Sequence, residues 1–314
     1  MAFLNLNYYG RTRKGVRPLS VPNAVFLVMN YRHRIPETSE PNPLAINPTL
    51  DVQFAELSDT GRVRPHNEDY LGHFVPTTPM LVRSHGWLFA LADGVGGQDK
   101  GEVASRTAIE SVLAGFRDAP GEEPHSALLS RLVKAANVEV YEAGMKTGVG
   151  RAAMATTFVG CALRFDRASI AHVGDSRCYL IRCAHATILT RDHTVAGEQS
   201  RMGLISSQEA AESPTRHVLS RSIGGEMFVN VETSEHQVLV GDVLVLCSDG
   251  LHGAVTPSEI ATIVTHSADL NAAAHKLVGL ANQVDGGDNI SVQLIQIRGV
   301  ERVGMYRGRP YRLR

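Results

Sequence analysis

Residues 87–97, with the sequence WLFALADGVGG, pass from an apolar run directly into an aspartate and a glycine-rich turn. An apolar run of this length between turn signals predicts a buried strand. Asp93 would then stand at the end of that strand, where a carboxylate is desolvated unless it is paired or holds a cation. The segment therefore predicts both a core strand and a charged site at its edge.

The same arrangement recurs at other aspartates along the chain. Asp249 follows the apolar run 243–248, Asp175 ends the run 170–174, Asp288 precedes a run that starts at residue 290, and Asp69 closes the segment RPHNED. Each turn taken alone is more simply a structural turn, because Asp and Gly are common turn residues. Several converging carboxylates, however, favour hard divalent metal ions with oxygen ligands.

Strands dominate the chain, which also contains two helical blocks. Helices are predicted near 101–117 and 125–144, and again near 257–266 and 270–283, where Thr256 to Glu259 forms a capping box. Strands are predicted at 51–57, 69–75, 87–92, 155–164, 169–174, 177–183, 229–238, 242–248 and 290–297. Short turns between consecutive strands indicate antiparallel sheets. We expect an α+β fold, a four-layer α-β-β-α sandwich of two mainly antiparallel sheets flanked by helix pairs, with a small helical flap.

Composition divides the 314 residues into three parts. Residues 1–48 carry scattered Arg and Pro and are expected to be a flexible extension, although the apolar stretch 24–29 leaves an integral strand open. Residues 49–298 form the expected folded domain, and 299–314 a basic C-terminal tail. At 43% hydrophobic and 20% charged, the chain can bury a sizeable core.

Charge and cysteine usage narrow the class of protein. The ends are basic and the interior is acidic, which argues against nucleic acid as a ligand. Cys161, Cys178, Cys183 and Cys247 form no CxxC pair and are expected to be small core residues. No apolar run approaches the length of a membrane span, and the start lacks a secretory pattern. We expect a cytoplasmic monomer.

Taken together, these segments resemble the type 2C metal-dependent serine/threonine protein phosphatases (the PPM family) in their bacterial form. The resemblance covers about 55–298 and keeps the family's order. It rests on RPHNED (64–69), DGVGG (93–97), GEVAS (101–105), ATT (155–157), AHVGDSRCY (171–179), LTRDHT (189–194), LSRSIG (219–224), SDGL (248–251) and DNIS (288–291).

The resemblance implies specific roles for the site residues. Asp93 would bridge two Mn²⁺ or Mg²⁺ ions, and Gly94 would offer its carbonyl to one of them. Asp249 and Asp288 would bind the other ion, and Asp69 would act through metal-bound water. It further implies that Asp175, with Asp249, holds a third ion, that Arg64 binds the substrate phosphate, that 194–222 is the flap, and that a eukaryotic-like Ser/Thr kinase is the signalling partner.

The expected reaction is hydrolysis of phosphoserine and phosphothreonine by a water that two metal ions activate. Many members carry a histidine at the glycine turn as proton donor, but this chain has Val95 and Gln98 there. A metal-bound water or His66 could substitute. Two alternatives stay open: a catalytically impaired phosphatase-like binding module, which should lack metal carboxylates, and a two-metal nuclease, which the acidic interior disfavours.

Overall fold

The computed structural model describes residues 50–95, 100–121, 123–146, 154–301, 303–306 and 309–312, the last two ranges as backbone only. Predictions about 1–48 and about Gln98 lie outside these residues. Within them, no helix is long and apolar enough to cross a membrane.

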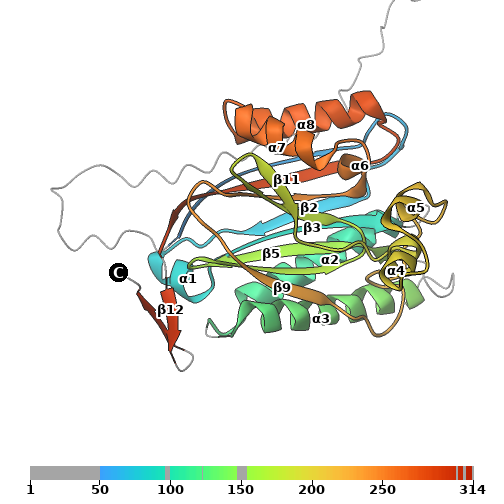
Figure 1. Ribbon diagram of the computed structural model, residues 1–314. Coiled ribbons are helices and arrows are strands. Elements are labelled where there is room, and N and C mark those ends of the chain that lie inside the picture. The colour runs from blue at the N-terminus through green and yellow to red at the C-terminus, as the bar shows by residue number, and fades with distance from the viewer. Residues whose placement is uncertain are drawn as a thin grey trace, which may run out of the picture.

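Two antiparallel sheets form the centre of the molecule (Figure 1). The first contains, in spatial order, β1 (Leu50–Asp59), β11 (Ile290–Val300), β10 (Val243–Cys247), β7 (Arg177–Arg182) and β8 (His185–Ile188). The second contains β2 (Asp69–Phe74), β3 (Trp87–Val95), β5 (Phe158–Arg164), β6 (Arg167–Val173) and β9 (Glu232–Gln237), and β4 (Ala155–Thr156) pairs with β3. The expected α+β class with antiparallel sheets is confirmed.

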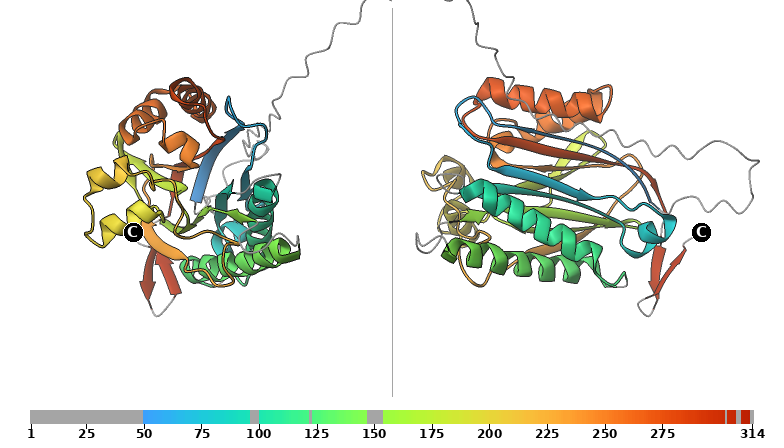
Figure 2. Two further views of the ribbon diagram at one scale, coloured as in Figure 1. Left: turned by 90° about the vertical axis from the view of Figure 1, so that its right-hand side faces the viewer. Right: turned by 180° about the vertical axis from the view of Figure 1, so that it is seen from behind.

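A helix pair covers the outer face of each sheet, as Figures 1 and 2 show from three directions. The pair α2 (Lys100–Arg117) and α3 (His125–Lys146) packs on the second sheet through Ile109, Phe116 and Leu129. The pair α7 (Pro257–His266) and α8 (Leu270–Val284) packs on the first sheet through Ile260 and Leu277. The helical blocks therefore fall where the apolar spacing predicted them.

A third apolar cluster lies between the two sheets. Phe54 of β1 and Phe89 of β3 meet edge to face with ring centroids 5.1 Å apart, and Leu246 and Ile295 belong to the same cluster. Phe89 is fully buried, which stabilises the fold by roughly 2–3 kcal/mol relative to exposure. This packing fixes the ends of the sheets against each other, and the site lies at one such end.

Capping boxes start two helices, the first of them at the predicted residues. The Thr256 hydroxyl accepts from the Glu259 amide, the Glu259 carboxylate accepts from the Thr256 amide, and Pro257 begins α7. Ser206 and Glu209 make the same pair at α5 (Ser207–Glu212). Together with α4 (Val195–Arg201), α5 forms a small helical segment beside one end of the sheets (Figure 1).

Several elements were not predicted. They are α1 (Pro79–Ser84), the single turn α6 (Asp249–His252), β8, and the two-stranded sheet of β12 (Val303–Tyr306) and β13 (Arg309–Arg312). Strand β11 continues to Val300, two residues beyond the predicted end of the domain. The prediction that all four cysteines are core residues is wrong for Cys183. It is exposed because Cys183 and Ala184 form the tight β7–β8 turn, both with positive φ.

Candidate metal and phosphate site

The sheets bring four predicted aspartates together from different strands. Asp69 starts β2 and lies directly opposite Asp93 of β3 in the antiparallel register. Asp249 follows β10 and Asp288 precedes β11, and these two strands pair in the other sheet. The site therefore straddles the interface between the sheets.

One serine links the two halves of this cluster. The Ser248 hydroxyl donates to Asp69 Oδ2 at 2.9 Å and accepts from the Ser291 amide at 3.0 Å. Ser248 ends the strand segment that leads to Asp249, so the hydrogen bond sets the distance between carboxylates of opposite sheets. The sequence contained Ser248 in the quoted motif but gave no signal for this bridging role.

The carboxylates are held in an environment that disfavours their charged form. Burial, reinforced by Asp249 and Asp288, raises the pKa of Asp69 to about 7, although hydrogen bonds from Ser291 and Ser248 oppose the shift. Burial and then Asp69 raise the pKa of Asp93 well above its usual value. Asp69 Oδ1 is also buried without a hydrogen-bond partner among the described residues. Cations would relieve this repulsion and fill the unused oxygen sites.

Asp175 and Asp249 extend the cluster. Burial and then the charge of Asp249 raise the pKa of Asp175 to about 7, and burial and then Asp288 raise the pKa of Asp249. His252 of α6 hydrogen-bonds through Nε2 to the Asp175 carbonyl at 3.0 Å, which anchors the β6–β7 connection against the helix that carries Asp249.

Gly94 occupies a position too crowded for a side chain. A Cβ there would lie 2.3 Å from the Gly101 carbonyl oxygen and 2.7 Å from that of Glu68. The Gly94 amide also donates to the Glu68 carbonyl at 3.1 Å. Glycine therefore lets the strand end, the 61–68 loop and the start of α2 approach closely.

Arg64 stands in a loop that Asn289 holds in place. The Asn289 side chain accepts from the Glu68 amide at 2.8 Å and donates to the carbonyls of Thr60 and His66. Arg64 Nη2 then lies 2.7 Å from Asp288 Oδ2, with the two side chains 48% and 37% exposed. Only one of its N–H groups is needed for Asp288, so the rest of the planar guanidinium can face a ligand.

A separate polar cluster lies at the base of the α4–α5 segment. His172, His193 and Glu232 are the one group of three potential metal ligands in the described part of the chain whose ligand atoms all fall within 4.8 Å of one another. The two imidazoles stack with centroids 4.7 Å apart. No motif or spacing had singled out the three residues as a group.

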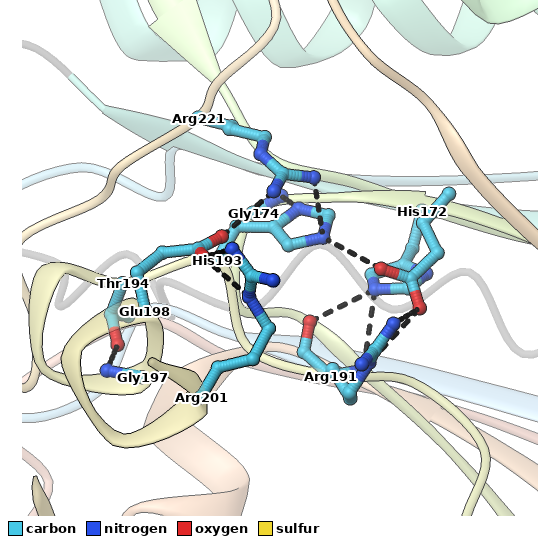
Figure 3. Close-up of polar contacts among 10 residues, drawn as sticks. His172, Gly174, Arg191, His193, Thr194, Gly197, Glu198, Arg201 and Arg221 are labelled. Carbon is cyan, nitrogen blue, oxygen red and sulfur yellow. Dashed lines mark hydrogen bonds and ion pairs between the residues drawn. The ribbon is translucent and has the colours of Figure 1, made fainter. Parts of the chain in front are cut away.

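Hydrogen bonds already occupy this cluster (Figure 3). The Gly174 amide donates to His193 Nδ1 at 3.1 Å, so in the neutral ring Nε2 carries the proton, 3.3 Å from Glu232 Oε2. Arg191 pairs with Glu232 at 2.7 Å, and Arg221 binds Glu198 at 2.7 Å while approaching His193. With two guanidinium groups beside it, we assign the cluster a structural role, tying α4 to β6 and β9.

Similarity to known proteins agrees with this site. A profile of the family described as protein phosphatase 2C matches residues 65–284. The chain therefore belongs to the protein phosphatase 2C family. It is a serine/threonine protein phosphatase of the bacterial, metal-dependent type.

Individual relatives cover most of the chain. Protein phosphatase PhpP of Streptococcus pneumoniae is 30% identical over 248 residues, which are 78% of this chain and 98% of that protein. The Mycobacterium tuberculosis serine/threonine phosphatase PstP/Ppp superposes with a TM-score of 0.70 at 30% identity, covering 79% of this chain and 99% of that structure. A structure of the PstP catalytic domain in complex with two manganese ions has a TM-score of 0.68 at 30% identity, covering 80% and 100%.

Proposed function

We propose that this chain hydrolyses phosphoserine and phosphothreonine in proteins at the carboxylate cluster, with two Mn²⁺ or Mg²⁺ ions bound there. The observation that carries the proposal is a group of buried and half-buried aspartates whose pKa values are raised, in which one Asp69 oxygen has no hydrogen-bond partner among the described residues. Such a group suits divalent cations, and its donors are all oxygen atoms. The impaired-binding-module alternative is disfavoured because the sequence retains every expected carboxylate.

Each residue then has a distinct task. Asp93, the Gly94 carbonyl, Asp249 and Asp288 would hold the two ions, with Asp69 beside them and Asp175 with Asp249 as a third cation site. When bound, the ions supply Lewis acidity and lower the pKa of a coordinated water.

Arg64 would bind the phosphoryl oxygens. Its guanidinium keeps Nη2 on Asp288 and presents its remaining N–H donors to the phosphate, where charge grows during displacement. A water molecule would attack phosphorus while the bond to the seryl or threonyl oxygen breaks, which gives inorganic phosphate and the free alcohol of the protein. Burial raises the pKa of the Cys161, Cys178 and Cys247 thiols, which makes these three side chains poor nucleophiles.

The substrates are phosphorylated proteins, and we propose that a eukaryotic-like Ser/Thr kinase produces them. The deciding experiment measures phosphate release from a phosphothreonine peptide with Mn²⁺, with Mg²⁺ and after exhaustive chelation. We expect release only with added metal. Undiminished turnover by the chelated protein would refute the metal mechanism, and cleavage of duplex DNA in place of peptide dephosphorylation would support the nuclease alternative.

A further inference from the structure

The departing seryl or threonyl oxygen needs a proton, and the glycine turn does not provide a donor among the described residues. Val95 is apolar and 44% exposed, so the position next to Gly94 presents only a hydrocarbon side chain. An alkoxide is a strongly basic leaving group, so a positioned acid should speed its departure substantially. A donor from another part of the chain is therefore worth identifying.

His217 reaches the carboxylate cluster from the segment that follows α5. Its Nδ1 lies 4.0 Å from Asp249 Oδ2, and its side chain is 57% exposed. The imidazole thus borders the proposed metal site and remains open to a substrate. This contact had no signal in the sequence, because 32 residues separate His217 from Asp249.

The backbone around His217 is well fixed. The Val218 amide donates to the Thr215 carbonyl at 3.1 Å, which closes a turn with His217 inside it. The Val218 carbonyl accepts from the Val195 amide at 2.8 Å, and Leu219 bridges to Thr194. The turn is therefore attached to the start of α4, which fixes the backbone that carries the imidazole near Asp249.

His217 and Arg64 flank the same cluster from two different loops. Arg64 is paired with Asp288 and His217 approaches Asp249, and the two carboxylates affect each other electrostatically. A phosphoryl group bound by Arg64 would therefore lie beside the carboxylate cluster that the imidazole also borders.

Other histidines near the cluster are less suited to this task. His252 bonds through Nε2 to the Asp175 carbonyl, and His193 is buried in the Glu232 cluster. His66 is exposed and lies in the loop that carries Arg64, so it is the direct competitor that an experiment must separate from His217.

We propose that His217 is a catalytic residue that protonates the leaving oxygen, an inference that rests on the proposed function. As water adds to phosphorus, the bond between phosphorus and the seryl or threonyl oxygen breaks and its electron pair stays on that oxygen. The proton on a ring nitrogen of His217 passes to the same oxygen and yields the neutral alcohol. The imidazole then recovers a proton from solvent.

Leaving-group dependence tests this role directly. The full-length chain is assayed with Mn²⁺ on a phosphothreonine peptide and on p-nitrophenyl phosphate, whose phenolate leaves without protonation. We expect His217→Ala and His217→Gln to lower kcat on the peptide by roughly 10²- to 10⁴-fold and on p-nitrophenyl phosphate by less than about threefold. His185→Gln, at an exposed histidine on edge strand β8, is the matched control and should change neither rate.

Three outcomes would overturn the proposal. They are an equal loss on both substrates, no loss on the peptide, and a peptide-selective loss in His66→Ala with none in the His217 variants. The Mn²⁺ concentration for half-maximal activity should be the same in His217→Ala and wild type, since a shift would mark His217 as a metal ligand instead. A wild-type protein inactive on both substrates would refute the proposed function itself.

Discussion

Replacing Asp69 with asparagine should stabilise the metal-free protein while removing a group needed at the site. Asp69 is buried, and its pKa is raised from 3.8 to about 7, first by burial and then by Asp249 and Asp288. The folded state therefore holds this proton more tightly than the unfolded state. The associated stability is fully present below about pH 4 and is lost as the pH rises through about 7.

The size of the effect follows from the shift. This shift of one carboxyl pKa lowers the free energy of unfolding by roughly 4 kcal/mol between pH 4 and pH 8. Because neighbouring carboxylates share the repulsion, we expect Asp69→Asn to recover about half of this lost stability, or ~2 kcal/mol, at pH 8. For a domain of this size that is roughly 4–8 °C in Tm.

Thermal melts in EDTA at pH 5 and pH 8 provide the assay. Wild-type Tm should fall between these pH values, and Asp69→Asn should fall less and melt higher at pH 8. Added Mn²⁺ should raise the wild-type Tm more than that of the variant, since binding to the folded state stabilises it.

A matched control variant should change Tm in the opposite direction. Asp242 is equally buried but paired with Arg182 at 2.7 Å, so Asp242→Asn should lower Tm at both pH values. The electrostatic reasoning would fail if Asp69→Asn melted below wild type at pH 8 in EDTA, or if both proteins showed the same pH dependence.

Three further predictions concern catalysis and domain limits. Asp249→Asn should lower kcat by several orders of magnitude with circular dichroism unchanged, and near-native turnover with normal metal content would show that Asp249 is not a ligand. Arg64→Ala should weaken phosphate binding by about 1.5–3 kcal/mol, which is a loss of affinity of roughly tenfold to a few hundredfold. The loss should be visible in KM and in inhibition by inorganic phosphate, and unchanged values would exclude contact between Arg64 and the substrate. Deleting residues 1–48 should leave Tm and peptide kcat/KM unaltered, because β1 begins at Leu50, and a Tm drop of many degrees would place the start of the domain earlier.

The positions of some carboxylates at the candidate site could be predicted because these residues follow short apolar strands. The ends of 87–92 and 243–248 carry Asp93 and Asp249, and local sequence alone marks such positions. The antiparallel register that sets Asp69 opposite Asp93, in contrast, is seen only in the structure.

Contacts that depend on how distant loops pack could not be predicted. The 4.0 Å approach of His217 to Asp249 and the hydrogen bond from Ser248 to Asp69 join residues without any shared periodicity. The exposed Cys183 was missed for a different reason, since its apolar neighbours hid a two-residue turn.

The pairing of β1 with β11 bears on how the chain folds during synthesis. Leu50 lies opposite Val300, so a ribosome that adds about 5–20 residues per second needs roughly 12–50 s to deliver the partner of the first strand. Until then Val52 and Phe54, both buried in the finished sheet, have no β11 to pair with or pack beside. We expect the nascent chain to bind chaperones during this interval, and the first sheet to close only after nearly all of the domain has left the exit tunnel.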